Sequence, residues 1–213
     1  TAPMSNEGPS VGVPACRSVR AWLVLGLVVV LGLASDLWTK HAAFERVAEV
    51  PVRIERDRVI ELFESGRSVG SDIPLHAPRV VIPGLLELTL VQNPGAVFGM
   101  GAGKRWIFVG FTVAALAFGL LMFGRWTRSH EWGSHAAIGL LIAGGLGNLY
   151  DRVMYACVRD FIHPLPGLNL PLGWSWPWGG REVWPYVSNV ADLWLLIGIG
   201  ILLVHGMRAP KKA

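Results

Sequence analysis

The stretch AWLVLGLVVVLGLASDLW, residues 21–38, decides how the rest of this sequence is interpreted. It is apolar almost throughout and carries one charge, Asp36, close to its end. A helix that crosses the hydrocarbon core of a bilayer needs about 20 such residues. The run is too long for the core of a cleavable signal peptide, and it leads into SDLWTK without a small-residue cleavage site. We therefore expect a membrane-spanning helix here.

Three more apolar runs follow along the chain. They cover residues 106–124, 134–150 and 190–207. The composition agrees with a membrane protein, since 52% of the residues are hydrophobic and only 16% are charged. The predicted fold class is an α-helical polytopic membrane protein with four transmembrane helices. We expect this membrane domain to span 20–207, between a disordered tail at 1–19 and a short tail at 208–213.

The distribution of basic residues predicts the orientation of the four helices. An even number of spans places both termini on one side. The tails and the short middle loop carry Arg17, Arg20, Arg125, Arg128, Arg208, Lys211 and Lys212. Because short cytoplasmic segments are enriched in Lys and Arg, both termini are expected in the cytoplasm. The long loops 41–105 and 151–189 then face outward, and the net charge of +4 gives no indication of nucleic-acid binding.

The two outer loops contain further local signals. Residues 85–93 alternate clearly between apolar and polar side chains, and residues 52–63 alternate in part. We therefore predict a small outer β-sheet built from both stretches, with a helix over 53–64 as the alternative. Segment 163–188 is rich in Pro, Gly and Trp, which excludes a long helix. It is predicted to be an anchor at the membrane interface or, alternatively, a lid over a site.

Four polar clusters lie at the outer ends of the four predicted spans. They are SDLWTK (35–40), NPGAVFG (93–99), GNLYDR with RDF (147–161) and SNVADLW (188–194). Ionisable residues at such positions are candidates for function. Two carboxyl groups in one partly dry site can share a proton, so that one activates water and the other protonates a leaving amine. The outer candidates are Asp151, Asp160 and Asp192, and Asp151 is also explained as a structural ion pair or helix cap.

Taken together, the four clusters resemble the bacterial lipoprotein signal peptidase family, signal peptidase II, over roughly residues 20–207. The resemblance implies an aspartyl endopeptidase of the bacterial cytoplasmic (inner) membrane. Such an enzyme removes signal peptides from prolipoproteins, cleaving just before a cysteine that carries a diacylglyceryl group. It implies contact with membrane lipid, no nucleic-acid partner, no metal and no other cofactor. A monomer is expected, with the active site on the outer, periplasmic side.

The resemblance also assigns roles to individual residues. The catalytic aspartates of the family match Asp160 and Asp192. The positions that match substrate-binding or supporting residues are Asn93, Gly95, Phe98, Gly144, Gly147, Asn148, Arg152, Asn189 and Ala191. Within this set, Arg152 corresponds to a substrate-backbone contact, and Asn148 and Asn189 to groups that orient the dyad. Asp36, Lys40 and Asp151 match structural polar positions.

The sequence departs from the family pattern in a few places. Ser188 stands where the family usually has Phe, and Arg159 stands where an apolar residue usually precedes the catalytic Asp. The outer segments 41–92 and 163–188 are longer than the family pattern. Two other classes of protein stay open at this point. One is a proton-coupled transporter that uses the aspartates as relay groups, and the other is a non-enzymatic assembly subunit that binds a partner through the outer sheet.

Overall fold

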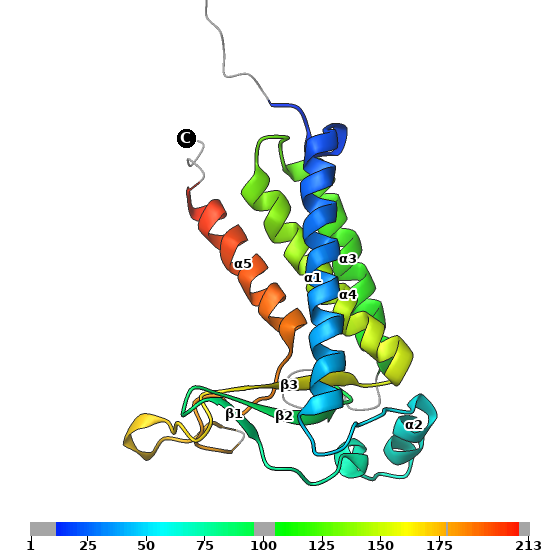
Figure 1. Cartoon of the computed structure of the whole chain (residues 1–213). Helices are drawn as coiled ribbons and strands as arrows, with labels where there is room; N and C mark the ends of the chain where they lie inside the picture. The colour runs from blue at the N-terminus through cyan, green and yellow to red at the C-terminus, as the bar shows by residue number, and fades with distance from the viewer. Residues whose placement is uncertain (1–11, 96–104, 178, 209–213) are drawn as a thin grey trace, which may run out of the picture.

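A computed structural model describes residues 12–95, 105–177 and 179–208. Four long helices lie side by side, and a small sheet covers one end of the bundle (Figure 1). The long helices are α1 (Val19–Arg46), α3 (Arg105–Trp126), α4 (Trp132–Tyr155) and α5 (Val190–Arg208). Each of the four predicted apolar runs lies within one of these helices.

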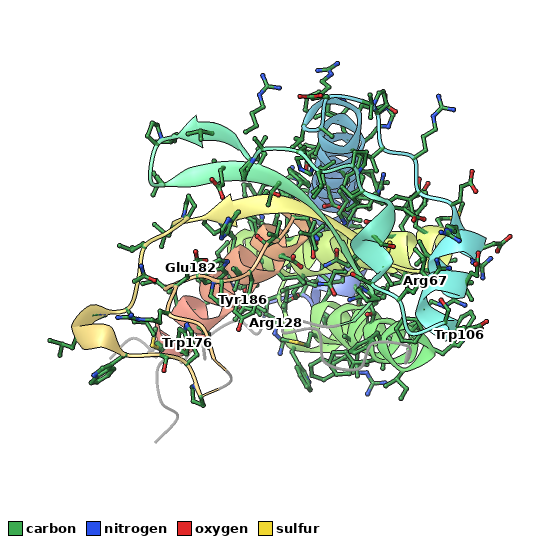
Figure 2. All side chains as sticks on the ribbon, turned by 90° about the horizontal axis from the view of Figure 1, so that it is seen from below. Arg67, Trp106, Arg128, Trp176, Glu182 and Tyr186 are labelled. Carbon is green, nitrogen blue, oxygen red and sulfur yellow. The ribbon has the colours of Figure 1, made fainter. Side chains whose placement is uncertain are left out.

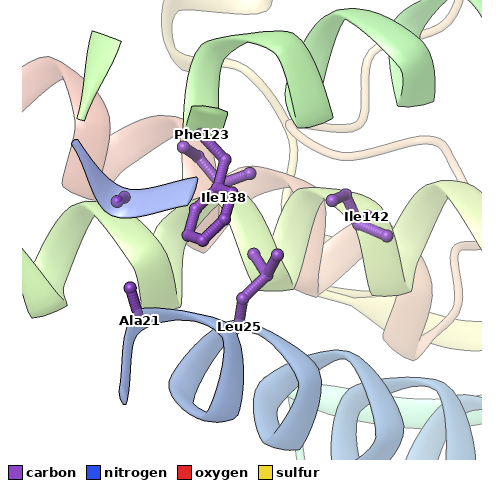
Figure 3. Packing of buried hydrophobic residues seen from close by; sticks show 6 residues of the cluster. Ala21, Leu25, Phe123, Ile138 and Ile142 are labelled. Carbon is purple, nitrogen blue, oxygen red and sulfur yellow. The ribbon is translucent and has the colours of Figure 1, made fainter. Parts of the chain in front are cut away.

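Helix α4 packs against α1, α3 and α5 and forms the centre of the bundle. Small residues let the helices approach closely: a Cβ on Gly139 would lie 2.9 Å from Val28, and one on Gly32 would lie 2.7 Å from Ala143. An apolar cluster fills the end of the bundle farthest from the sheet (Figure 3). Its buried members are Ala15, Ala21, Leu25, Phe123, Ile138 and Ile142.

Two of the helices are long and apolar enough to cross a membrane, judged by length and composition. They are α1 and α3, and α5 contains a shorter apolar stretch over Val190–His205. Helix α1 begins after Ser18, whose hydroxyl accepts a hydrogen bond from the Ala21 amide at 3.3 Å. Residues 1–11 of the predicted tail lie outside the described residues, and Ala15–Arg17 form the short 3₁₀ helix η1.

The sheet has three antiparallel strands in the order β1 (Arg79–Ile82), β2 (Leu86–Asn93) and β3 (Val158–Pro164). The predicted strand at 85–93 is confirmed as β2. Strands β1 and β2 form a hairpin, and its turn uses Gly84 at φ +68°, a conformation that glycine adopts without strain. Strand β3 was not predicted; it pairs with β2 so that Asp160 lies opposite Val91.

The predicted strand over 52–63 is wrong, and the alternative helix is the better description. Residues Arg56–Glu64 form helix α2. The buried side chains are Val59 and Leu62, which are three residues apart and therefore share one helix face. Val59 packs with Val69 and with Ala156 and Cys157, which follow α4. The partial alternation seen in the sequence reflects the same apolar residues, because a period of 3.6 and a period of 2 overlap over so short a stretch.

Candidate active site

The two predicted catalytic carboxyl groups meet where β3 passes the beginning of α5. Asp160 lies on β3 and is 2% exposed. Its Oδ1 accepts a hydrogen bond from Asn189 Nδ2 at 2.6 Å, and its Oδ2 accepts one from Asn93 Nδ2 at 3.0 Å. Asn93 ends β2 and Asn189 directly precedes α5, so three separate segments fix the position of this carboxyl group.

Asp192 lies in the first turn of α5 and takes part in a reciprocal cap. Its Oδ2 accepts from the Asn189 amide at 3.3 Å, while its own amide donates to Asn189 Oδ1 at 3.1 Å. This is the arrangement of a capping box, in which two side chains satisfy the free amides of a helix start. The other oxygen, Oδ1, accepts from Asn148 Nδ2 at 2.8 Å. The cap therefore sets the direction in which Asp192 presents its carboxyl group.

Two asparagines connect the two carboxyl groups. Asn189 Nδ2, which contacts Asp160, also lies 3.2 Å from Asn148 Oδ1 as a hydrogen-bond donor. Asn148 in turn contacts Asp192. A continuous path of side-chain hydrogen bonds thus runs from Asp160 through Asn189 and Asn148 to Asp192. An asparagine amide does not ionise, so it can hydrogen-bond to both carboxyl groups without taking the proton that they share.

The pKa of Asp160 is raised to about 7, mainly by burial and also by the negative charge of Asp192. The hydrogen bonds from Asn93 and Asn189 act against this shift because they stabilise the charged carboxylate. Asp160 therefore holds a proton over a pH range in which an exposed aspartic acid is fully ionised. This is the property required of a carboxyl group that donates a proton near neutral pH.

A buried network of charges lies beside this site. Lys40 is completely buried; its Nζ lies 2.8 Å from Asp36, 3.3 Å from Asp151 and 3.1 Å from Asn148 Oδ1. Asp151 also pairs with Arg159 at 2.8 Å. Two cations and two anions are present, so their formal charges cancel. The predicted pairing of Asp36 with Lys40, one helical turn apart, is confirmed.

We predict that Asp151→Asn destabilises the protein by about 3–5 kcal/mol, since removal of one partner leaves buried cations uncompensated. Asp151 is fully buried and contacts both Lys40 and Arg159. The measurement is the free energy of unfolding of the purified protein in detergent. The matched control is Glu61→Gln, which removes exposed pairs with Arg58 and Arg67 and should cost at most about 1 kcal/mol. Equal losses in both variants would contradict this role of Asp151.

Two glycines and an alanine allow α1, α4 and α5 to meet beside the carboxyl groups. A Cβ on Gly147 would collide with the carboxylate of Asp36, and one on Gly144 would collide with the carbonyl oxygen of Ala191. The Ala191 amide donates to Asp36 Oδ1 at 2.9 Å. These positions thus join the buried charge network to the start of α5, where Asp192 is located.

Arg152 lies at the edge of the site and reaches toward the loop after β2. Its guanidinium donates to the Asn148 carbonyl and to the Gly95 carbonyl, each at 3.2 Å, and lies 5.6 Å from the ring of Phe108. The Gly95 amide donates to Asn93 Oδ1 at 3.1 Å. Phe98, the remaining predicted site residue, lies outside the described residues.

Sequence reasoning missed the role of Arg159. Arg159 departs from the family pattern. Its amide and guanidinium both donate hydrogen bonds to Asp151, and its guanidinium lies 4.5 Å from the Tyr155 ring. Asp151 therefore forms ion pairs with both Arg159 and Lys40. The signal that could have revealed this is a basic residue inside a short buried stretch, where a charge needs a partner.

The main-chain hydrogen bonds of Ser188 explain why this position accepts a serine. Its amide and carbonyl both bond to Ile162 on β3 at 2.8 Å. Main-chain pairing does not depend on the side chain, so Ser can occupy a position where the family usually has Phe.

Comparison with known proteins gives consistent results. A family profile described as Signal peptidase (SPase) II matches residues 27–208. The lipoprotein signal peptidase of Desulfitobacterium hafniense (strain DSM 10664 / DCB-2) is 32% identical over 157 residues, which cover 73% of this chain and 88% of that protein. The lipoprotein signal peptidase of Bifidobacterium longum (strain DJO10A) is 43% identical over 124 residues, covering 58% of this chain and 59% of that protein.

Solved structures agree on the fold. A bacterial membrane enzyme determined by the in meso method at 1.9 Å has a TM-score of 0.60 and 23% sequence identity, over 87% of this chain and 93% of that one. The family profile extends from the middle of α1 to the last described residue of α5 and includes both aspartates. The chain therefore belongs to the signal peptidase II family of proteases.

Proposed function

We propose that this protein is an intramembrane aspartyl endopeptidase that removes signal peptides from prolipoproteins bearing a diacylglyceryl cysteine. In this proposal the bond that is cleaved lies just before the lipidated cysteine. The observation that carries it is the pair of carboxyl groups, Asp160 and Asp192, linked through Asn189 and Asn148. Membership of the signal peptidase II family and the names of the relatives support the substrate class.

The proposed reaction uses one proton shared by the two carboxyl groups. The ionised carboxylate takes a proton from a water molecule, and the water oxygen attacks the carbonyl carbon of the scissile peptide bond. The protonated carboxyl group stabilises the carbonyl oxygen as negative charge develops on it. When the carbon–nitrogen bond breaks, the leaving amine takes a proton from the dyad. Because the two groups titrate together, we assign the proton to the dyad as a whole.

The proposed position in the cell is the bacterial cytoplasmic membrane, with four spans and both termini in the cytoplasm. The apolar character of α1 and α3 and the arrangement of the long helices in one bundle support it. Short segments rich in arginine, including Arg17 and Arg128, lie at the end opposite the sheet. By the positive-inside rule that end is cytoplasmic, so the dyad lies at the outer surface.

The remaining predicted residues have supporting roles in the proposal. Arg152 and Gly95 are already joined by a hydrogen bond, and we assign both to the binding of the substrate main chain. Gly144, Gly147 and Ala191 allow the close helix contacts that hold the dyad. Asp36, Lys40 and Asp151, together with Arg159, form the neutral charge network beside it. No cofactor is part of the proposal.

The function is tested by mapping the cleaved bond. The purified protein is incubated with a diacylglyceryl-modified prolipoprotein in detergent, and both products are identified by mass spectrometry. The expected products are the intact signal peptide and a lipoprotein whose first residue is the modified cysteine. Cleavage within the signal peptide, or at several bonds, would contradict the assignment.

We expect kcat/KM to fall as the pH rises through about 7, where Asp160 loses its proton. Asn93→Ala removes a hydrogen bond that lowers the pKa of this carboxyl group. The descending limb of the profile should therefore move to higher pH in this variant, while the activity at the optimum falls. The control is Asn169→Ala, an exposed asparagine that bonds only within its own loop. An unchanged limb in Asn93→Ala would contradict the assignment of Asp160.

A further inference from the structure

Residues 165–187, between β3 and α5, form a hairpin that we call the tryptophan arm; residue 178 lies outside the described residues. Its two sides are joined by the Leu170 amide to the Arg181 carbonyl and by the Val183 amide to the Leu168 carbonyl, each at 2.7 Å. Trp176 Nε1 donates to the Glu182 carbonyl at 2.8 Å across the same hairpin. These bonds give the segment a defined shape even though Pro and Gly exclude a helix.

The base of the tryptophan arm is fastened to the sheet. His163 in β3 lies 2.8 Å from Glu87 in β2 and 3.7 Å from Glu182 in the arm. Ser188, just after the arm, pairs with Ile162 through main-chain hydrogen bonds. The tryptophan arm is therefore a fixed continuation of β3, the strand that carries Asp160.

The first part of the tryptophan arm, before Arg181 and Glu182, carries no charged side chain. Residues 164–180 include no Asp, Glu, Lys, Arg or His. Leu172 is 89% exposed and Trp174 is 66% exposed, and both are near the tip. The first charged residue that follows is Arg181, whose guanidinium lies beside Gly173. The next residue, Glu182, is directed toward His163 at the base of the arm. An exposed leucine and tryptophan with an arginine beside them match the headgroup region of a bilayer, where indole rings are half buried and phosphate is near.

The position of the tryptophan arm fits the same level of a membrane. It projects sideways from the sheet end of the bundle (Figure 1), and Trp176 and Glu182 lie well apart from Trp106 on the other side of the helices (Figure 2). Exposed Trp106 lies at this end of α3, exposed Trp38 lies eight residues before this end of α1, and exposed Trp22 lies near the opposite end of α1. Trp22 and Trp38 are separated by about 24 Å at 1.5 Å per helical residue, which is less than the roughly 30 Å of a hydrocarbon core, so the membrane boundary on this side lies beyond Trp38, toward the sheet.

We propose that the tryptophan arm docks on the outer surface of the bilayer that contains the helices, with Leu172 and Trp174 at headgroup level and Arg181 beside lipid phosphate. This proposal rests on the membrane position given under the proposed function and adds a binding surface to it. Because the tryptophan arm continues β3, docking at its tip fixes the height of Asp160 relative to the membrane. The occupant is the bilayer itself rather than a partner protein.

The test measures depth at single labelled sites. In a Cys16→Ser background, the remaining cysteine, Cys157, is buried, and burial raises the pKa of its thiol to about 12, so it does not react. Leu172→Cys carries a nitroxide label in vesicles of phosphatidylcholine and phosphatidylglycerol. The matched control is Leu75→Cys, which replaces another highly exposed leucine, in the loop before β1. Both leucines are highly exposed, so neither substitution removes a buried contact.

Collision rates with oxygen, which enters lipid, and with a water-soluble nickel chelate report the depth of each label. At position 172 we expect the oxygen-to-nickel ratio to be several-fold higher than at position 75. A third label, Leu31→Cys on the exposed face of α1, reports whether the helices are embedded at all. A deep label at 31 with a water-exposed label at 172 would overturn the docking proposal and leave the proposed function intact. A water-exposed label at 31 would overturn the membrane position itself.

The same labels also distinguish lipid from a protein substrate as the occupant of the tryptophan arm. If the label at position 172 is water-exposed in vesicles and becomes shielded only when a prolipoprotein is added, the tryptophan arm binds substrate and the docking proposal is wrong. If the label has the same high oxygen-to-nickel ratio with and without substrate, lipid is the occupant.

Discussion

Asp160→Asn and Asp192→Asn are each expected to lower kcat by about 10²–10⁴-fold or more, the range for loss of a general acid or base. Asparagine keeps the shape of the side chain but cannot exchange a proton at neutral pH. Each carboxyl group has one partner that bridges to the other, Asn189 for Asp160 and Asn148 for Asp192. The two groups therefore act as one unit, and the double variant should be little worse than either single variant.

The same variants should remain folded, and the pH dependence of their stability provides a control. The pKa of Asp160 is raised in the folded protein, so between about pH 4 and pH 7 the folded state holds a proton that the unfolded state has lost. Stability of the wild type is therefore fully present below this window and should fall as the pH rises through it. Asp160→Asn lacks this group and should lose less stability over the same range.

The measurements are single-turnover cleavage and thermal unfolding in one detergent at several pH values. Near-normal cleavage by Asp160→Asn would show that the dyad assignment is wrong. Loss of folding in Asp160→Asn would leave Asp192→Asn as the informative variant. Gln92, the neighbour of Asn93 on β2, provides a further comparison, because Gln92→Ala alters a buried polar side chain whose Oε1 has no hydrogen-bond partner among the described residues.

The second large effect concerns the lipid on the substrate. In the proposed function, Asp160 and Asp192 act at the end of an apolar bundle, which restricts attack to a peptide bond held at that depth. A signal segment fixes depth loosely by itself, whereas each buried methylene of an acyl chain contributes about 0.8 kcal/mol to anchoring. Binding energy from this unreactive part of the substrate can position the scissile bond against Asp160 and Asp192. We expect rapid cleavage of the diacylglyceryl form and almost none of the unmodified precursor.

The comparison uses one prolipoprotein prepared with and without the diacylglyceryl group, in lipid vesicles and in detergent. A gel shift or a change of mass reports cleavage, and the Asp192→Asn protein shows the background. Equal cleavage of the two precursors would remove the lipid requirement and leave the protease assignment in place. If the folded wild-type protein cleaves neither precursor, the non-enzymatic alternative gains support.

The long helices and β2 could be predicted from the sequence because their signals are local. An apolar run of membrane length leaves the backbone few options other than a helix. The alternation in 85–93 likewise matches a strand with one face buried, as Leu90 and its neighbours show. The predicted site residues also come together where the structure describes them, since the elements that carry them meet where β3 passes the start of α5.

The features that could not be predicted depend on partners far away in the sequence. Strand β3 is short, and its identity as a strand comes from pairing with β2, about 70 residues earlier. The role of Arg159 follows from its ion pair with Asp151. The prediction for α2 was wrong because nine residues give too few turns to separate a helical period from a strand period. Such contacts are set by tertiary structure, which local patterns do not encode.

The cap at the start of α5 links activity to the integrity of a single helical turn. Asn189 and Asp192 close that turn, and the same two side chains hold the dyad in register. Helix ends fray before helix centres when a protein is heated. Fraying of this turn would separate the carboxyl groups while the apolar bundle stayed intact. Heat inactivation would therefore begin as a local and reversible event, well below the temperature at which the helices come apart.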